Sequence, residues 1–407
     1  MSNTRAVIFA ITYLGIALGR VPGLKLNRVG IALLGAICMM IFGGIKTPDA
    51  VSFINWPTVF LLFGFFVISA QLRLSGFYDK IANGLSARLD HPARFLLVLM
   101  VVTAGLSAFL NHDIVCFVFV PVVGAALLRK GLNPIPFLVA LALSSDIGSA
   151  ATIVGSAQDM MIGEVAHLDF GRYILWSLVP VLAALGAAYG IIWLMSSKNI
   201  QAASSARAAS AGCSYSYNRA HTIKGLVFLA VVVALFFSSL PKEIIALAAA
   251  GLHLASPKFH TEDLLRLVDW PILVLFMGLF VVTGAFQSTG YGAQAVQWLG
   301  RSGFDLNVPR NLVLATAALS NLINNSATVM LLLKMVDLSH PTTGYMLALA
   351  NSFGGGFIIL GSVANIIVVQ QARDMGITIS FRDFARLGVP VTLAALAALL
   401  LWVALVP

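Results

Sequence analysis

The sequence predicts an all-α polytopic membrane protein with two inverted-topology repeats, about ten transmembrane helices, two re-entrant hairpins and two broken helices. Three observations lead to this fold class. The chain is 59% apolar and only 10% charged. The first half of the sequence recurs in the second half. Polar or glycine-rich breaks interrupt apolar segments at matching positions of the two halves.

The low charge excludes an ordinary soluble domain, in which about 25% of residues are charged. A helix that spans a bilayer needs about 20 mostly apolar residues. Segments 57–72, 173–196 and 387–407 carry no charge at all. No small-residue cleavage site follows the first apolar run, so we expect residues 6–21 to form a retained helix rather than a signal peptide.

The net charge of +9 would suggest a nucleic-acid partner in a soluble protein. Here the basic residues gather in short loops between apolar segments, as cytoplasmic loops do, so we expect no nucleic-acid partner. The three cysteines, Cys38, Cys116 and Cys213, show no metal or redox spacing. We therefore expect no cofactor beyond a coupling ion, Na⁺ or H⁺.

An internal repeat relates the two halves. Residues 54–77 match residues 268–291 at a constant separation of 214, which pairs Trp56 with Trp270 and Gly64 with Gly278. Downstream, LSAFLNHDIV parallels LSNLINNSATV, and each half ends in an apolar span that contains a proline. The expected segments are a first repeat 1–196 with a hairpin 93–128 and a broken helix 134–165, a Ser/Ala-rich cytoplasmic linker 197–220, and a second repeat 221–407 with a hairpin 309–338 and a broken helix 343–374.

The span count predicts the orientation. The first hairpin has arms of about 16 residues around a polar tip, which is short for a crossing, so each repeat has five crossings and the second repeat is inverted. With the N-terminus outside, 18 of the 25 basic residues fall in cytoplasmic loops. Both termini are therefore expected outside the cell. Hairpins that cross the bilayer fully give the same sidedness and stay open as an alternative.

The four breaks supply the candidate site, because non-helical backbone at membrane depth must be satisfied by protein, ligand or water. Paired interrupted helices in two halves indicate a transport site. Glycine packing and interhelical hydrogen bonds are the alternative explanation. The candidate substrate- and ion-binding residues are Asn111, His112, Asp113, Ser145, Asp146, Gly148, Gly155, Ser156, Asn324, Asn325, Ser326, Thr328, Asn351, Ser352, Gly354, Gly355, Gly361, Ser362 and Asn365.

Three carboxyl groups lie in the breaks of the first half: Asp113, Asp146 and Asp159. An ionised group at the bilayer centre costs at least about 2.5 kcal/mol on insertion scales. Their counterparts in the second half are neutral, so the charge is asymmetric. We regard Asp113 and Asp146 as candidates for proton or cation coupling. A helix N-cap is the alternative for Asp113, and capping or pairing is the alternative for Asp159. His112 either joins a proton path or only forms hydrogen bonds at the turn.

These tips and breaks resemble the ion transporter superfamily, which includes divalent-anion/sodium symporters, citrate transporters, arsenite permeases and sodium/proton antiporters. The segment 324–328 resembles the Ser-Asn-Thr tip of dicarboxylate symporters, with Asn for the first Ser. The segment 111–113 resembles the Asn-x-Asp tip of arsenite permeases. The segment 145–159 resembles the citrate/arsenite-type pattern, although Asp146 and Asp159 replace Asn and the Pro-Pro pair is absent. Residues 354–365 fit that pattern better.

The resemblance implies an elevator-like motion of hairpins and broken helices against the other helices. Dicarboxylate members are dimers, so a homodimer is one arrangement open to this chain. No Lys or Arg lies within the breaks, so an anion would be held by amides, hydroxyls, helix dipoles or a bound cation.

The leading hypothesis is a secondary transporter in the inner (plasma) membrane that moves a small anion, a carboxylate or an inorganic oxyanion, by symport or antiport with H⁺ or Na⁺. An arsenite-type efflux permease, with Asp113 titrating, and a Na⁺/H⁺ antiporter are the alternatives. An enzyme is disfavoured, because no nucleophile motif or second acid/base cluster accompanies His112. A channel is disfavoured because inverted repeats suit alternating access.

Overall fold

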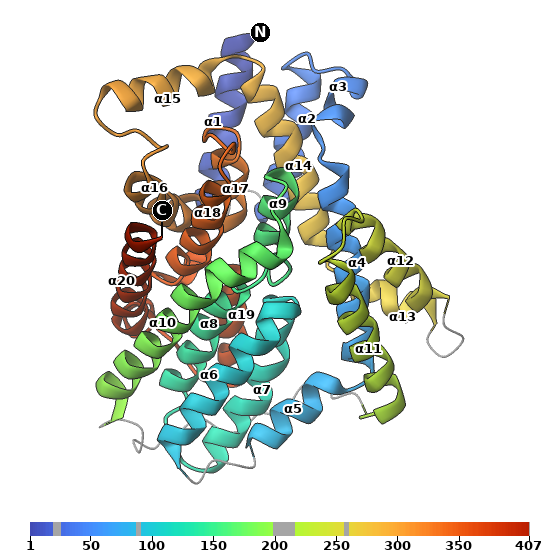
Figure 1. Ribbon diagram of the computed structural model, residues 1–407, viewed down its shortest axis with the longest axis vertical. Coiled ribbons are helices and arrows are strands. Elements are labelled where there is room, and N and C mark those ends of the chain that lie inside the picture. The colour runs from blue at the N-terminus through green and yellow to red at the C-terminus, as the bar shows by residue number, and fades with distance from the viewer. Residues whose placement is uncertain (19–25, 87–90, 198–215, 256–259, 407) are drawn as a thin grey trace.

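The computed structural model describes residues 1–407 except 19–25, 87–90, 198–215, 256–259 and 407. Within the described part of the chain, every regular element is a helix, and the helices are gathered into an elongated bundle (Figure 1). Most of the expected linker 197–220 lies outside the described residues. So do Cys213 and several basic residues of the charge argument: Arg20, Lys25, Arg88, Lys198, Arg207 and Lys258.

The helices of the first half are α1 (Ser2–Leu18), α2 (Arg28–Ile41), α3 (Thr47–Phe53), α4 (Trp56–Leu74), α5 (Phe77–Ser86), α6 (Pro92–Phe109), α7 (His112–Arg129), α8 (Ile135–Ser149), α9 (Ala157–Val165) and α10 (Phe170–Ser196). Those of the second half are α11 (Arg219–Leu235), α12 (Lys242–Leu254), α13 (Thr261–Arg266), α14 (Trp270–Gln287), α15 (Tyr291–Arg301), α16 (Pro309–Ile323), α17 (Asn325–Leu332), α18 (Pro341–Gly354), α19 (Val363–Asp374) and α20 (Phe381–Leu405), with a short 3₁₀ turn η2 (Ile359–Gly361).

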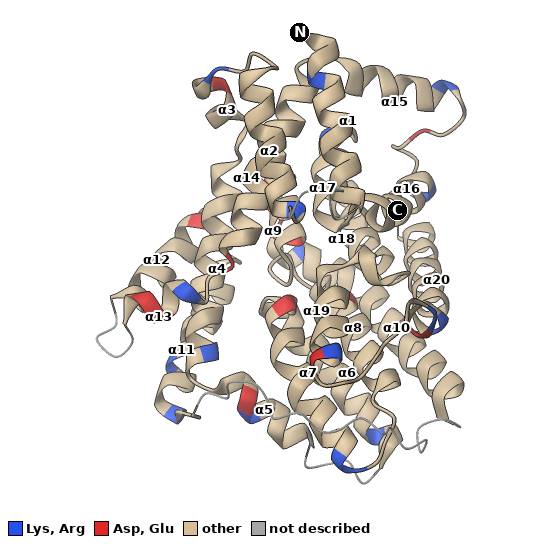
Figure 2. Cartoon of the chain, turned by 180° about the vertical axis from the view of Figure 1, so that it is seen from behind, with Lys and Arg blue, Asp and Glu red and all other residues tan. Residues whose placement is uncertain are grey.

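The chain is a multi-pass membrane protein. In the described segments, six helices are long and apolar enough to cross a bilayer, namely α4, α6, α7, α10, α14 and α20. Large apolar side chains cover the outer surface of α10, where Leu175 and Leu194 are more than three-quarters exposed. Figure 2 shows long stretches of helix without a charged residue. Such a surface suits lipid and not water.

The two long arms of the first hairpin differ from the expected length. α6 and α7 have 18 residues each instead of about 16, because α6 begins one residue early at Pro92 and α7 continues to Arg129. In the second hairpin α17 is short, with eight residues, and ends at Leu332. Helix length alone therefore leaves the number of crossings, about ten by the span count, as a prediction.

Residues paired by the repeat adopt the same local structure. Asn55 caps α4 by accepting from the amide of Thr58 at 2.9 Å, and Asp269 caps α14 by accepting from the amide of Ile272 at 3.1 Å. After each of these helices a glycine turns the chain with positive φ, 71° at Gly76 and 76° at Gly290. The chain then enters α5 or α15, which lie at opposite ends of the molecule (Figure 1).

α5 and α15 are short amphipathic helices, for which hydropathy gave no expectation. They differ in their packing. α5 packs against α7, and its Tyr78 is fully buried with its hydroxyl 2.9 Å from that of Ser69. α15 buries none of its residues, and its Trp298 is 67% exposed. The end of the molecule with α5 is therefore built on protein contacts, whereas α15 lies open on the surface.

The halves interlock where glycines allow close helix crossings. α4 packs against α12, and a Cβ on Gly64 would lie 2.7 Å from the backbone of Ala246. α14 packs against α2, and a Cβ on Gly278 would lie 3.0 Å from the backbone of Ala32. Small residues at such crossings let membrane helices approach closely. The broken helices form the centre of the bundle, since every residue of α8 from Pro136 to Ser149 is buried.

The crossing at Gly64 predicts a folding defect. We expect Gly64→Ala to lower the stability of the purified protein, because an added methyl group overpacks the crossing, typically by about 1–3 kcal/mol. Thermal unfolding in detergent measures this. Gly186→Ala is the control, since nothing lies within 4 Å of a Cβ on Gly186 in α10. Equal unfolding temperatures for the two variants would contradict the close crossing.

Candidate functional site

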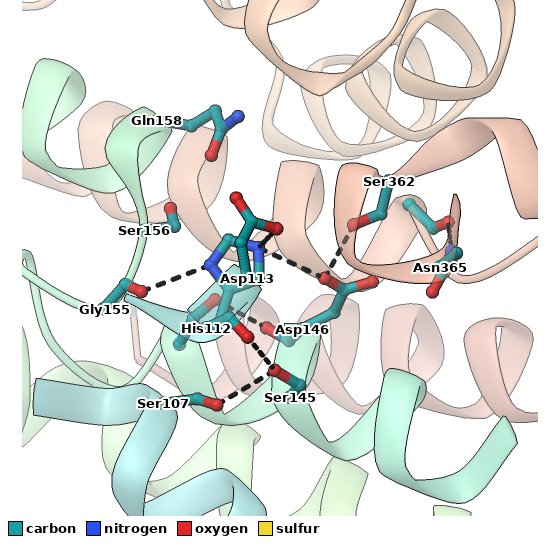
Figure 3. A network of polar contacts seen from close by, with 12 residues as sticks. Ser107, His112, Asp113, Ser145, Asp146, Gly155, Ser156, Gln158, Ser362 and Asn365 are labelled. Carbon is teal, nitrogen blue, oxygen red and sulfur yellow. Dashed lines mark hydrogen bonds and ion pairs between the residues drawn. The ribbon is translucent and has the colours of Figure 1, made fainter. Parts of the chain in front are cut away.

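The tip of the first hairpin places a histidine and a carboxyl group at the start of α7. The side chain of Asn111 accepts a hydrogen bond from the amide of Asp113 at 2.8 Å, so Asn111 is the N-cap. This differs from the capping role considered for Asp113, whose carboxyl is free for other contacts. All three residues of the tip are at least 93% buried. Local capping therefore fixes the turn and points His112 and Asp113 into the bundle (Figure 3).

His112 lies between two carboxyl groups from different elements. Its Nε2 is 3.5 Å from Oδ1 of Asp113 and 3.6 Å from Oδ1 of Asp146 in α8. Its Nδ1 lies 3.3 Å from the carbonyl oxygen of Gly155, in the break between α8 and α9. We call His112, Asp113 and Asp146 the acid cluster. It joins the first hairpin to the first broken helix.

A hydrogen bond ties the acid cluster to the second half. The hydroxyl of Ser362 donates to Oδ1 of Asp146 at 2.8 Å, across 216 positions in sequence (Figure 3). Below the cluster, the hydroxyl of Ser145 donates to the carbonyl of His112 at 3.2 Å and lies 2.9 Å from the hydroxyl of Ser107. The two broken helices therefore meet at Asp146.

Two glycines, one near the end of α8 and one between α8 and α9, are required because neighbouring backbone leaves no room for a side chain. A Cβ on Gly148 would collide with the backbone of Ala104 in α6, and one on Gly155 would collide with the carbonyl oxygens of Ser149 and Ser107. Ser156 then starts α9 as its N-cap, accepting from the amide of Asp159 at 3.0 Å and donating to its Oδ2 at 2.6 Å. Ser156, and not Asp159, is therefore the cap of α9, and the Asp159 carboxylate pairs with the Ser156 hydroxyl.

The second hairpin has a neutral tip. Asn324 has a φ of 81° and a ψ of 151°, which lie outside the left-handed helical region in a range that glycine normally occupies. Its side chain accepts from the amide of Ser326 at 2.9 Å. The hydroxyl of Ser326 accepts a 2.8 Å hydrogen bond from Nε2 of Gln158 in α9, which is a second polar contact between the halves.

The second break is built around Gly355. Nδ2 of Asn365 donates to the carbonyl of Gly355 at 2.9 Å, and the carboxamide of Asn325 would touch a Cβ on Gly355 at 2.9 Å. A Cβ on Gly361 would lie 2.5 Å from both the Gly355 carbonyl and Oδ1 of Asn321. Gly354 packs against Ala317 in α16. These glycines bring backbone carbonyls and Asn side chains together where a side chain would fill the space.

Several buried oxygen atoms of the site lack a hydrogen-bond donor. They are Oδ1 of Asp113, Oδ2 of Asp146, Oδ1 of Asp159, Oδ1 of Asn321, Asn325, Asn351 and Asn365, and Oγ1 of Thr328. The orientations of Asn321 and Asn365 are fixed, because each Nδ2 donates to two backbone carbonyls. Buried polar atoms are normally paired. The set is rich in acceptors and therefore favours a ligand that brings protons or positive charge.

The predicted residues fall into two groups. Asp146 and Ser362 join the halves, and Gly355, Asn325 and Asn365 lie together in the second break. Asn351, Ser352 and Thr328 are also buried, in α18 and α17, but no direct contact with the acid cluster connects them to it in the described structure.

Three polar residues of the site were not predicted: Ser107, Gln158 and Asn321. Ser107 and Asn321 lie in the segments that the repeat aligns, but on the arms of the hairpins and not at the tips that were taken as the site. A polar residue within an apolar arm was the available signal. Gln158 directly follows the first break, and its partner in the other half could not be inferred from spacing.

Among the described residues, no group of three His, Cys, Asp or Glu side chains is arranged to hold a metal ion. The acid cluster can hold and exchange protons. A small movement of the imidazole toward either carboxyl group would bring the two within hydrogen-bond distance, so that they could share a proton. The neutral oxygens of the second break can accept hydrogen bonds or bind a monovalent cation.

Comparison with known proteins identifies the class. A family model described as "Citrate transporter" matches residues 13–350, and the chain belongs to this family. An uncharacterized transporter of Mycobacterium tuberculosis is 30% identical over 431 residues, covering 99% of this chain and 98% of the relative. The silicon efflux transporter LSI3 of Oryza sativa is 25% identical, covering 96% of this chain and 95% of the relative.

A putative transporter arsB of Dictyostelium discoideum is 30% identical over 172 residues, which cover 42% of this chain and 30% of the relative. The YdaH transporter of Alcanivorax borkumensis has a similar structure, with a TM-score of 0.58 at 15% identity, covering 99% of this chain and 96% of that one. The resemblance to the ion transporter superfamily is confirmed, and the family indicates a membrane transporter rather than an enzyme.

The contact between the broken helices predicts the effect of removing one hydroxyl. We expect Ser362→Ala to slow transport by roughly tenfold or more, because a hydrogen bond to a charged group is worth about 1.5–3 kcal/mol. Initial rates in proteoliposomes measure this. Ser69→Ala is the matched control, since the Ser69 hydroxyl is also buried but contacts Tyr78 outside the site. An equal decrease of the transport rate in both variants would contradict a specific role of the Ser362 hydroxyl in transport.

Proposed function

We propose that the protein is a secondary active transporter in which Asp113 and Asp146 couple the flux of a small anion to H⁺. The cargo would be a carboxylate or an inorganic oxyanion. The observation that carries this proposal is the position of His112 between two buried carboxyl groups, with Ser362 of the other half bonded to one of them. A proton taken up here changes the charge at a point where the first hairpin and both broken helices meet.

Protons suit the first half better than Na⁺. The acid cluster contains an imidazole, whose protonation changes in the physiological range, and a protonated imidazole would repel a metal cation. Sodium coupling would instead use the neutral oxygens of Asn325 and Asn365 in the second half. A Na⁺/H⁺ antiporter would use both halves, and it stays the third alternative.

An anion would be held without arginine or lysine. α7, α9, α17 and α19 all begin near the breaks, and helix N-termini offer unpaired amide groups and the positive end of the dipole. Transporter folds with broken helices commonly hold carboxylates in this way. The description of the family as a citrate transporter favours a carboxylate for the leading reading.

Alternating access would follow from movement of the hairpins and broken helices, α6–α9 and α16–α19, against the remaining helices in an elevator-like motion. The hydrogen bonds of Asp146 with Ser362 and of Gln158 with Ser326 lie within this moving group, whereas contacts with the remaining helices, such as the Tyr173 hydroxyl donating to the Ala150 carbonyl, would rearrange. We also propose an inner-membrane location with both termini outside, and a homodimer by analogy with the dicarboxylate symporters.

An uncharged oxyacid is the second candidate cargo, in the manner of an arsenite-type efflux permease. It is favoured by the excess of buried acceptors over donors, because a solute with several hydroxyl groups would satisfy the oxygens of Asn321, Asn351 and Asn365. The names of the silicon efflux and arsB relatives agree with this candidate. In this reading, proton entry through Asp113 would drive export.

Proton coupling predicts the phenotype of a neutral substitution. We expect Asp113→Asn to abolish the acceleration of solute flux by an imposed proton gradient, while solute exchange without a gradient persists, because the amide cannot exchange a proton. Proteoliposomes with a trapped pH dye measure both. Asp337→Asn, at an exposed carboxyl in the loop after α17, is the control. Flux driven by Na⁺ and unchanged in Asp113→Asn would move the coupling site to the Asn-rich second half.

Transport assays with two arsenic oxyacids of different charge distinguish the two classes of cargo. Arsenous acid is uncharged at neutral pH and rich in hydroxyl groups, whereas arsenate is an anion. If the leading reading holds, citrate, sulfate or arsenate will show saturable flux and arsenous acid will not. Saturable flux of arsenous acid without arsenate would establish the second candidate. Liposomes without protein give the background leak.

A further inference from the structure

A cavity of about 180 Å³ lies beside the second hairpin, at the end of the molecule that carries α15. Its walls come from the α3–α4 junction, from Val165 at the end of α9, from Phe280 in α14, and from Met330 and Lys334 on α17 and the turn that follows it. The charge-based orientation places this end outside the cell. Residues of both halves of the chain line this cavity.

The cavity lies at the outer ends of the same two helices whose inner ends carry the site. Met330 is one turn beyond Ser326 along α17, and Val165 is about two turns beyond Gln158 along α9. α9 and α17 pack against each other. At the inner end they are joined by the 2.8 Å hydrogen bond from Gln158 to Ser326, and both residues are at least 92% buried.

Gln158 lies three residues beyond Gly155, whose carbonyl oxygen contacts His112 of the acid cluster. In Figure 3 the carboxyl group of Asp113 extends toward the side where Gln158 lies, away from Ser107 and Ser145. A solute that moved from the cavity along the α9–α17 contact toward Asp113 would meet Gln158 and Ser326 first. Their hydrogen bond links the two halves, so it opens when α9 and α17 separate.

The cavity also supplies a positive charge that the breaks lack. Lys334 lines it and a neighbouring cavity of about 310 Å³ next to α15, and its ammonium group pairs with no carboxylate in the described segments. Its backbone is held by Nε2 of Gln287, which donates to the Lys334 carbonyl at 3.3 Å. Asn55, whose Oδ1 caps α4, lines the cavity as well. An ammonium and an amide are donors suited to a small oxyanion or carboxylate.

We propose that this cavity is the outer entrance of the transport path, that Lys334 attracts anionic cargo to it, and that the hydrogen bond between Gln158 and Ser326 is the gate between the entrance and the acid cluster. The role of Lys334 rests on the proposed transport of an anion. The position of the entrance and gate does not depend on the cargo, so the two can be tested separately.

The gate is tested by thiol labelling, which requires no transport. In a background without the three native cysteines, Ser145→Cys places a thiol of nearly the same size beside the acid cluster, and His112→Cys is a second reporter. We expect a membrane-impermeant methanethiosulfonate added from the α15 side to label Ser145→Cys at least severalfold faster when Gln158→Ala is also present. Asn55→Cys, in the cavity wall, should be labelled rapidly in either background.

Two controls fix the interpretation. Gln71→Ala removes another buried glutamine, one that binds the carbonyl of His221 far from the site, and should not accelerate labelling. Asn83→Cys on the exposed face of α5 should be labelled only from the opposite side. Labelling of Ser145→Cys and His112→Cys that is unchanged by Gln158→Ala, or that occurs only from the α5 side, overturns the assignment of the gate.

The charge is tested with citrate and sulfate as probes. We expect Lys334→Gln to raise the KM for the transported anion by roughly two- to fivefold with little change in kcat, since an exposed charge contributes up to about 1 kcal/mol. The KM of the variant should also respond less to added salt. Arg301→Gln, at the end of α15 and also exposed, is the matched control.

The outcomes separate the two proposals. If the KM is unchanged in Lys334→Gln but labelling is faster with Gln158→Ala, the role of Lys334 is overturned and the assignment of the entrance stands. Loss of proton coupling in Asp113→Asn decides the proposed function and says nothing about the gate. If Gln158→Ala does not accelerate labelling of Ser145→Cys while proton coupling is intact, the entrance lies elsewhere.

Discussion

The burial of two carboxyl groups around one imidazole is the constraint on which the rest of the structure depends. Such charges are expensive at membrane depth unless they are paired or protonated. The bundle meets that requirement by bringing a hairpin tip, a helix break and the Ser362 hydroxyl of the other half to one point. Any state of the protein that separates these elements must neutralise the carboxyl groups or let water reach them. Conformation and protonation are thereby linked by the packing itself.

The sequence predicted much of this architecture because its strongest signals are local. The uncharged segment 57–72 lies within α4, which runs from Trp56 to Leu74, since a capping Asn and a proline mark its start. The breaks were predicted because Gly, Ser and Asn interrupt apolar runs. The structure interrupts its α-helices over 150–156 and 355–362, whereas Ser145, Asp146, Gly148, Asn351 and Ser352, which were expected within the breaks, lie in α8 and α18. The amphipathic helices α5 and α15 escaped prediction because short, half-polar segments carry no hydropathy signal.

The site was predictable in composition and not in pairing. Asp113 and Asp146 stood out because a charge in an apolar segment requires a reason. That Ser362 would bond to Asp146, or Gln158 to Ser326, depends on how the two halves dock, and no spacing within either half encodes it. The N-cap role considered as the alternative for Asp113 is taken by Asn111, since both are good caps and only the backbone of the turn selects between them. Asn321 was overlooked because its environment is set by Gly361, 40 positions away.

The unequal packing of α5 and α15 has a consequence for handling the protein outside a membrane. The free energy that holds α5 in place comes from buried side chains such as Tyr78 and survives transfer into a micelle. α15 has no such interior, so its position depends on what surrounds the molecule. We therefore expect the replacement of lipid by detergent to affect the end with α15 more than the end with α5. Nanodiscs, which retain the lateral pressure of a bilayer, are the better medium for studying the second hairpin.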